Sequence, residues 1–198
     1  MEVAESVLKN HEKHAIHLLS PHDEHYRHIY AADKKTPLIL YYRGRLSDPD
    51  IPVVGVIGSR SCTSYGEVVT KAAVSELVQK GNIIASGLSF GIDALAHKTT
   101  LKCLGVTYAF VPCGLHKTQP ASHTALMEQI TDTGAVITPY PFGKEALPFL
   151  FIRPFHWEEL RTRLLVRYPS CHRGTLQEWK PEHCPKCFAK GKTRACCP

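Results

Sequence analysis

Two short segments of this sequence combine glycine and serine with groups that can hold an anion. The first contains Gly58, Ser59 and Arg60, the second contains Ser86 and Gly87, and each follows an apolar run. Glycine allows a phosphate to approach the backbone closely, backbone N–H groups attract it, and an arginine guanidinium binds two of its oxygens. These residue types therefore predict a phosphate-binding site formed by two loops.

The elements that position these loops alternate between strand-length apolar runs and segments with helical periodicity. Apolar runs of this length predict buried strands, at Val53–Ile57, Asn82–Ala85, Val106–Val111 and Ala135–Thr138. Apolar residues at helical spacing predict helices between them, over 64–80, 91–103 and 122–133. Strands joined by helices form a parallel sheet with right-handed crossovers, which brings both loops to one edge of that sheet.

The pattern predicts a Rossmann-like three-layer α/β/α fold with a mainly parallel sheet over residues 38–153. Leu38–Tyr42 is expected to add a strand, and residues 1–37 form a lead-in with a short helix at His22–Ala32. In the helix over 64–80, the spacing predicts that six side chains face the sheet: Tyr65, Val68, Val69, Ala72, Ala73 and Leu77. In the helix over 122–133, the inward residues are expected to be Leu126, Met127 and Ile130.

Several enzyme classes are disfavoured by the motifs that these loops lack. Neither G-x-x-x-x-G-K-[ST] nor a G-x-G-x-x-G after a strand occurs, which argues against ATP hydrolysis and dinucleotide redox chemistry, and no cofactor is expected. No nucleophile–base pair is evident, so no catalytic residue is assigned. Asp93 is interpreted as an acid favoured by a helix start, and His97 as a packed, hydrogen-bonded residue.

The charge and the cysteines are concentrated in the last part of the chain. Of the formal net charge of +6, residues 154–198 contribute +5 and residues 1–153 contribute +1. Five of the eight cysteines also lie there, namely Cys171, Cys184, Cys187, Cys196 and Cys197. With no long apolar run and no signal-peptide layout at its start, the sequence is expected to be soluble and cytoplasmic, away from membranes.

Two groups of side chains invite a metal interpretation. Histidines recur at intervals of three in the first part of the chain, at His11, His14 and His17 and again at His22, His25 and His28. Such spacing is more typical of a solvated helix face, because metal ligands need converging partners and a second shell, so no metal is predicted there. Cys184-x-x-Cys187 resembles half of a zinc site, but the second cysteine pair is adjacent.

The body of the sequence resembles the DNA-processing protein A family (DprA, also called Smf). The resemblance rests on Gly58-Ser-Arg60, Tyr65-Gly66, the segment Ser86–His97, Cys113-Gly-Leu115 and Tyr140-Pro141, in that order. It implies a single-stranded DNA-binding protein that forms a homodimer and helps to load the RecA recombinase during natural transformation (competence), and that is not known as an enzyme. In that family the Gly-Ser-Arg loop belongs to a pocket for DNA phosphates.

The sequence departs from the family after Cys113-Gly-Leu115. An Asp and a Tyr-Pro pair are usual there, whereas this chain has His116-Lys-Thr-Gln-Pro120, and His123 stands where an Asn is expected. Lys117 is included among the candidate phosphate-binding residues, although a solvated loop lysine is an equally good interpretation.

The larger departure lies in residues 154–198, which are interpreted as a translation in a shifted reading frame. If the reading frame is moved forward by one nucleotide, the codons from Trp157 onward permit the run Gly-Arg-Asn. In the same frame, the codons around Trp179 permit Asn-Gly-Ser-Leu-Asn-Thr-Ala. Both runs are similar to motifs with which the family continues. Without the family's further strands, the sheet is expected to be incomplete at its carboxyl-terminal end and to keep an unprotected edge.

Two other functions stay open on the sequence. One is a nucleotide-binding or phosphoribohydrolase-type enzyme on a Rossmann-like fold, although the Pro-Gly-Gly-x-Gly-Thr loop of such enzymes is missing. The other is a non-functional fragment that lacks core strands and a dimer surface.

Overall fold

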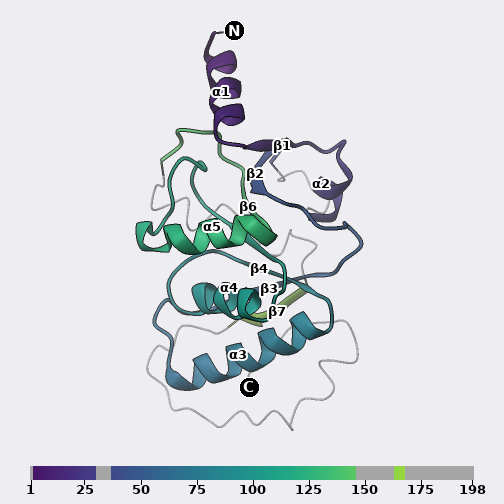
Figure 1. Ribbon diagram of the computed structural model, residues 1–198, viewed down its shortest axis with the longest axis vertical. Coiled ribbons are helices and arrows are strands. Elements are labelled where there is room, and N and C mark those ends of the chain that lie inside the picture. The colour runs from purple at the N-terminus through teal and green to yellow at the C-terminus, as the bar shows by residue number, and fades with distance from the viewer. Residues whose placement is uncertain (1, 30–36, 146–162, 168–198) are drawn as a thin grey trace.

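The computed structural model describes residues 2–29, 37–145 and 163–167 of the 198-residue chain (Figure 1). Its helices are α1 (Glu2–Lys13), α2 (Glu24–Ile29), α3 (Ser64–Gln79), α4 (Ile92–Lys102) and α5 (Thr124–Thr133), with a short 3₁₀ helix η1 (Ala121–His123) before α5. Its strands are β1 (His17–Leu19), β2 (Leu40–Gly44), β3 (Val53–Ile57), β4 (Ile83–Ser86), β5 (Thr107–Phe110), β6 (Ala135–Thr138) and β7 (Arg163–Arg167).

The strands form one sheet in the order β1-β2-β6-β5-β4-β3-β7. The five strands from β6 to β7 are parallel, whereas β2 pairs antiparallel with β6 and β1 antiparallel with β2. The α/β Rossmann-like fold with a mainly parallel sheet is thereby confirmed. All four predicted strands of the parallel part are present, and β3 and β6 have the predicted bounds.

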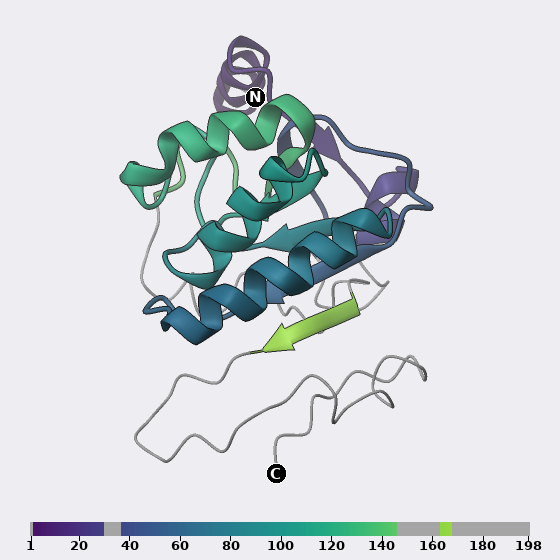
Figure 2. The same ribbon diagram turned by 60° about the horizontal axis from the view of Figure 1, so that its bottom comes forward.

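The three crossover helices lie side by side on one face of the sheet (Figure 2). Strands β3, β4, β5 and β6 follow one another across the sheet in a single direction. Because each crossover is right-handed, every connecting helix then falls on the same side. On the opposite face, the described covering element is α2, whose Tyr26 joins the core cluster of that face.

Alternation along the strands explains how both faces of the sheet become buried. Val54, Val56 and Ile84 point toward α3 and α4, while Ile83 and Phe110 point toward the other face. Period-two alternation sends neighbouring side chains to opposite faces, so strands buried on both sides must be apolar almost throughout. This is the reason that the strands were visible in the sequence as continuous apolar runs.

The predicted buried face of α3 is right at Leu77 but wrong at Tyr65, Val68 and Ala72, while that of α5 is right. The buried residues of α3 are Gly66, Thr70, Val74 and Leu77, and Tyr65 and Val68 are 45% and 67% exposed. A helix with small and polar residues on its inner side offers little apolar contrast between its faces, so periodicity did not fix its rotation. In α5, Leu126, Met127 and Ile130 are buried as predicted.

The edge of the sheet at β3 is paired with a strand that the sequence did not indicate. β7 lies parallel to β3, with a register irregularity between Gly55 and Val56. Within the described residues, β3 is therefore paired on both sides, and β7 is the outermost strand at this end of the sheet. The remaining residues of the segment 154–198, including its cysteines, lie outside the described part.

The first part of the chain packs against the antiparallel end of the sheet. α1 extends away from the sheet (Figure 1), and His11 near its end is buried and accepts a hydrogen bond at Nε2 from the N–H of Phe142 (3.2 Å). Burial lowers the pKa of His11. In the described ranges, no helix combines the length and the apolar character that crossing a bilayer requires.

Candidate nucleic-acid interface

The two predicted loops meet at the carboxyl ends of β3 and β4. The N–H of Ile92 donates to the carbonyl oxygen of Ser59 (3.2 Å), which ties the start of α4 to the Gly58–Arg60 loop. A Cβ added to Gly91 would lie 2.2 Å from the Ser59 oxygen and 2.6 Å from the Arg60 oxygen. Gly91 has φ +73°, a conformation that favours glycine. The predicted proximity of the loops is therefore confirmed, and it depends on Gly91.

Ser86 faces the interior rather than the solvent. Its side chain is fully buried, and its hydroxyl donates to the carbonyl oxygen of Val56 (2.7 Å). The hydroxyl thus links β4 to β3 beneath the loops. Because this hydroxyl is buried, a ligand arriving from solvent does not contact it. The role that the structure gives to Ser86 is to connect the two strands.

An anionic group of the protein itself occupies the space between the loops. The carboxyl group of Asp93, in the first turn of α4, is only 6% exposed. Burial raises its pKa to about 6, while interactions with the backbone N–H groups of Gly58, Ser89 and Gly87 lower it. Its Oδ1 is buried without a hydrogen-bond partner among the described residues. The inner part of the predicted phosphate site is therefore filled by Asp93.

The outer part of the site is open to solvent. Arg60 is exposed, and Ser59 is half-buried with its Oγ accepting a hydrogen bond from the N–H of Ser61 (3.2 Å). The loop leads into α3, whose N-cap Thr63 accepts a hydrogen bond from the N–H of Gly66 (3.1 Å). An exposed arginine next to a helix N-terminus offers a positive charge and backbone dipoles to an incoming anion.

Lys117 lies on the loop after β5, at the same edge of the sheet. Its Nζ is 2.7 Å from Oε1 of Glu145, and this exposed ion pair is joined by His116, whose Nε2 is 3.7 Å from the same oxygen. The pKa of Glu145 is lowered chiefly by the hydrogen bond from Lys117. A phosphate that binds Lys117 must compete with this carboxylate.

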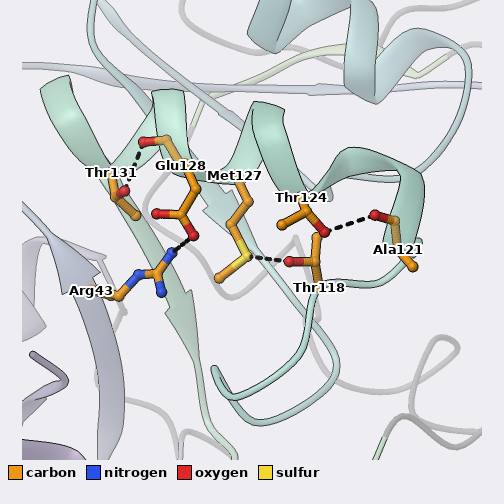
Figure 3. Close-up of polar contacts among 7 residues, drawn as sticks. All are labelled: Arg43, Thr118, Ala121, Thr124, Met127, Glu128 and Thr131. Carbon is orange, nitrogen blue, oxygen red and sulfur yellow. Dashed lines mark hydrogen bonds and ion pairs between the residues drawn. The ribbon is translucent and has the colours of Figure 1, made fainter. Parts of the chain in front are cut away.

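Side-chain contacts hold the loop that carries Lys117 against α5, and a further contact holds α5 against β2. Figure 3 shows Thr118 donating to the sulfur of Met127 (3.1 Å) and Thr124 capping the carbonyl of Ala121 (2.7 Å). Thr131 donates to the carbonyl of Glu128, and Glu128 pairs with Arg43 of β2 at 2.6 Å (Figure 3). These contacts attach α5 to β2 and fix the position from which Lys117 projects.

Two histidines near the loops are structural. Thr107 donates its hydroxyl proton to the Ile84 carbonyl, so the Nδ1 of His97 must donate to Thr107 (2.7 Å). Its Nε2 is then unprotonated, and it has no hydrogen-bond partner in the described part of the chain. Burial lowers the pKa of His97 to about 3, so it stays neutral at physiological pH. His123 is also buried, with its Nδ1 donating to the carbonyl of Leu88 (2.9 Å).

Two features of the site were missed by sequence reasoning. The sequence pattern indicates Asp93 only as a helix-start residue, although an acid two residues after a glycine at a strand–helix junction can equally turn into the crevice. No local pattern links Glu145 to Lys117, which lies 28 residues earlier. In the described residues, no group of three or more His, Cys, Asp or Glu side chains is placed to hold a metal ion.

Comparison with known proteins decides the family. The family model described as DNA recombination-mediator protein A matches residues 17–153, which is well over half of the chain. The chain belongs to the DNA recombination-mediator protein A family. Protein Smf of Synechocystis sp. is 36% identical over 142 residues, covering 70% of this chain and 36% of the relative. DNA processing protein DprA of Streptococcus pneumoniae is 33% identical over 115 residues, covering 58% and 40%.

Solved structures of two DprA proteins have the same fold as this family member. The X-ray structure of DprA from Streptococcus pneumoniae matches with a TM-score of 0.59 and 31% identity, over 69% of this chain and 48% of that one. A structure of DprA from Helicobacter pylori, described as showing a unique single-stranded DNA binding mode, matches with a TM-score of 0.60 and 25% identity, over 69% and 61%. The sequence matches span between 28% and 40% of the length of the curated relatives.

Proposed function

We propose that this chain binds single-stranded DNA through its phosphates and acts as a recombination mediator. The observation that carries the proposal is the exposed Arg60, next to the half-buried Ser59 at the carboxyl end of β3 and close to the N-terminus of α3. The binding would be independent of base sequence, because the contacts go to phosphate oxygens. Membership of the DNA recombination-mediator protein A family supports this assignment, as does the single-stranded DNA binding described for the Helicobacter pylori protein.

The buried Asp93 refines the binding mode. Since its carboxylate interacts with the N–H groups of Gly58 and Gly87, a phosphate placed deep between the strands would face a negative charge. We therefore place the phosphate at the outer rim, on Ser59 and Arg60, with Gly58 leaving room for the side chain of Ile92. Ser86 and Gly87 then shape the crevice and hold Asp93, and Lys117 contributes from the neighbouring loop.

The test compares Arg60→Ala with a matched charge control. Lys102→Ala removes one positive charge from the opposite end of α4, where the side chain is exposed. We expect Arg60→Ala to weaken binding of an oligothymidylate about tenfold and to reduce the slope of log affinity against log salt by about 0.7. Lys102→Ala should leave both nearly unchanged. Equal behaviour of the two variants in a fluorescence-anisotropy titration would overturn the proposal.

The contribution of Lys117 to DNA binding is tested by substituting Glu145, its ion-pair partner. Glu145→Gln removes the carboxylate that lies 2.7 Å from Lys117 and keeps the shape of the side chain. If Lys117 contacts DNA, this change should raise affinity by about threefold, a small effect because an exposed ion pair is weak. Combined with Lys117→Ala, Glu145→Gln should have no further effect. Unaltered affinity in the single variant would remove Lys117 from the interface.

We further propose that the intact family member acts as a homodimer that helps to load RecA, and that residues after about 153 result from a shifted reading frame. The family match stops at residue 153, which supports this boundary. Sequencing the coding DNA across codons 148–160 tests the shift. An intact frame would make the cysteine-rich segment a native part of the chain and would leave the DNA-binding assignment to the loops of residues 38–153.

A further inference from the structure

Two histidines from distant parts of the chain hold the turn over residues 141–144, which follows β6. The N–H of Phe142 donates to Nε2 of His11, in the last turn of α1, over 3.2 Å. The next N–H along the chain, that of Gly143, donates to Nδ1 of His116, in the loop after β5, over 3.1 Å. Two consecutive backbone donors of this turn are therefore satisfied by imidazole rings.

Both hydrogen bonds require the neutral form of histidine. A backbone N–H donates only to a ring nitrogen that carries no proton, which assigns the proton of neutral His11 to Nδ1 and that of neutral His116 to Nε2. In an imidazolium both ring nitrogens carry protons, and neither can accept a hydrogen bond. Protonation of either histidine therefore breaks its bond to the turn.

Ring contacts centre on Phe142 and join the same elements. Its ring centroid lies 4.8 Å from that of His14, which directly follows α1, and 5.3 Å from that of His116. The ring of His11 lies 6.4 Å from Phe142 and 5.0 Å from Tyr41 of β2. The end of α1, β2, the loop after β5 and the turn thus meet around one phenyl ring.

The surroundings of His11 offer nothing that stabilises a positive charge. His11 is 2% exposed, and its Nδ1 is buried without a hydrogen-bond partner among the described residues. The ring of Tyr41 faces it, and burial raises the pKa of the Tyr41 hydroxyl, so this group stays uncharged. Among the described residues no carboxylate pairs with His11, and burial lowers its pKa. The other charged groups on α1 and on the turn are exposed, namely Glu12, Lys13 and Lys144.

His116 has a different electrostatic environment. Its Nε2 lies 3.7 Å from Oε1 of Glu145, and Lys117 competes for the same oxygen at 2.7 Å. A protonated His116 loses the bond from Gly143 and keeps an attractive partner in Glu145. A protonated His11 keeps none, so it must leave the turn and reach water. His11 is therefore the more acid-sensitive of the two contacts.

We propose that these contacts form an acid-sensitive latch, in which His11 and His116 hold the 141–144 turn between α1 and the loop that carries Lys117. Protonation opens the latch and frees the end of α1. The inference does not depend on the proposed function, because the latch acts in the free protein. The open form binds protons that the closed form excludes, so opening increases as the pH falls below about 6.5, the ordinary pKa of histidine.

The experiment measures hydrogen exchange of the Phe142 and Gly143 amides by NMR in the full chain. Rates are expressed as protection factors, which remove the intrinsic pH dependence of exchange. Between pH 7.5 and pH 5 we expect both protection factors to fall about tenfold in wild type, since histidine is protonated in the open form. The amide of Val111, which donates to the carbonyl of Ile137 within the sheet, is the internal control and should keep its protection.

Two substitutions keep the hydrogen-bond acceptors and remove the titration. Glutamine can place its amide oxygen where a histidine has Nε2, and asparagine where it has Nδ1, so the matched changes are His11→Gln and His116→Asn. The double variant should show no such fall in protection. His25→Gln is the control, because Nε2 of His25 lies 3.0 Å from the carbonyl oxygen of Ser47, a bond that an imidazolium can keep. It should behave as wild type.

Wild-type protection factors that are equal at the two pH values overturn the latch, and so does an equal fall in the double variant. If the substitutions disturb the fold, nitrogen NMR of the wild-type imidazoles decides instead. Neutral His11 should then carry its proton on Nδ1 and titrate below a histidine in an unstructured peptide. A proton on Nε2, or titration at the peptide value, overturns the proposal. The DNA titrations are read separately, so either inference can fail without the other.

Discussion

The two loops at the carboxyl ends of β3 and β4 have similar residue types and opposite surroundings. In the β4 loop, the Ser86 hydroxyl is buried and bonded to Val56, and the carboxylate of Asp93 lies against the backbone. In the β3 loop, Arg60 is exposed and Ser59 is half-buried. Backbone N–H groups that could bind an anion can therefore interact with a carboxylate of the protein itself, as in the β4 loop. They can also stay available to an anion from solvent, as in the β3 loop. Of the two loops, the β3 loop is the one that presents an exposed charged side chain, Arg60.

The contact that joins the two loops is expected to give the largest effect when broken. Gly91→Ala places a Cβ against the backbone of Ser59 and Arg60 at a positive φ, and neither backbone segment can move easily. We expect the free energy of unfolding, measured with urea, to fall by about 4 kcal/mol.

The matched control for this change is Gly81→Ala. Gly81 also has a positive φ, of +77°, but a Cβ there meets nothing within 4 Å. Backbone strain alone should then lower the free energy of unfolding by about 1 kcal/mol. Similar losses in the two variants would mean that the loop contact is not what Gly91 protects.

The next effect concerns the carboxylate in the inner crevice and has a defined pH dependence. The pKa of Asp93 is raised from 3.8 to about 6 in the folded state. Between these values the folded protein holds a proton that the unfolded chain has lost, so this group makes the protein less stable as pH rises from about 4 to 6. At pH 7 the resulting destabilisation, relative to pH below 4, is about 3 kcal/mol.

Asp93→Asn removes this dependence. The difference in free energy of unfolding, variant minus wild type, should therefore increase by about 3 kcal/mol in favour of the variant between pH 4 and pH 7. Other titrating groups are present in both proteins and cancel in this difference. Parallel stability profiles of the two proteins across this pH range would show that Asp93 ionises normally in the fold.

The smallest expected effects come from substituting Ser59 and Ser86, the serines of the two loops. Ser86→Ala removes the buried hydrogen bond to Val56 and should lower the free energy of unfolding by about 1–2 kcal/mol, with unchanged DNA affinity. Ser59→Ala should do the reverse, with a stability change below about 0.5 kcal/mol and a threefold loss of affinity. Urea unfolding and anisotropy titrations measure both. A loss of affinity in Ser86→Ala alone would reverse the roles given to the two loops.

Sequence reasoning succeeded where a feature depends on short-range pattern. The bounds of β3 and β6 and the buried face of α5 followed from apolar runs and helical spacing. It failed in the first half of α3, where Tyr65 and Val68 are exposed, because Gly66 and Thr70 are not apolar and yet belong to the contact side. It also gave no sign of β7, whose pairing with β3 joins residues more than a hundred positions apart.

The sequence by itself determined the parallel α/β framework, the family, and the placing of two glycine-containing loops at one edge of the sheet. The tertiary structure decided which loop is open. That choice depends on contacts between residues of separate elements, such as Ser86 with Val56, Asp93 with Gly58, and Phe90 with His123. Local pattern fixes the residue types of a loop, whereas only the packing of elements against one another decides which polar groups stay in contact with solvent.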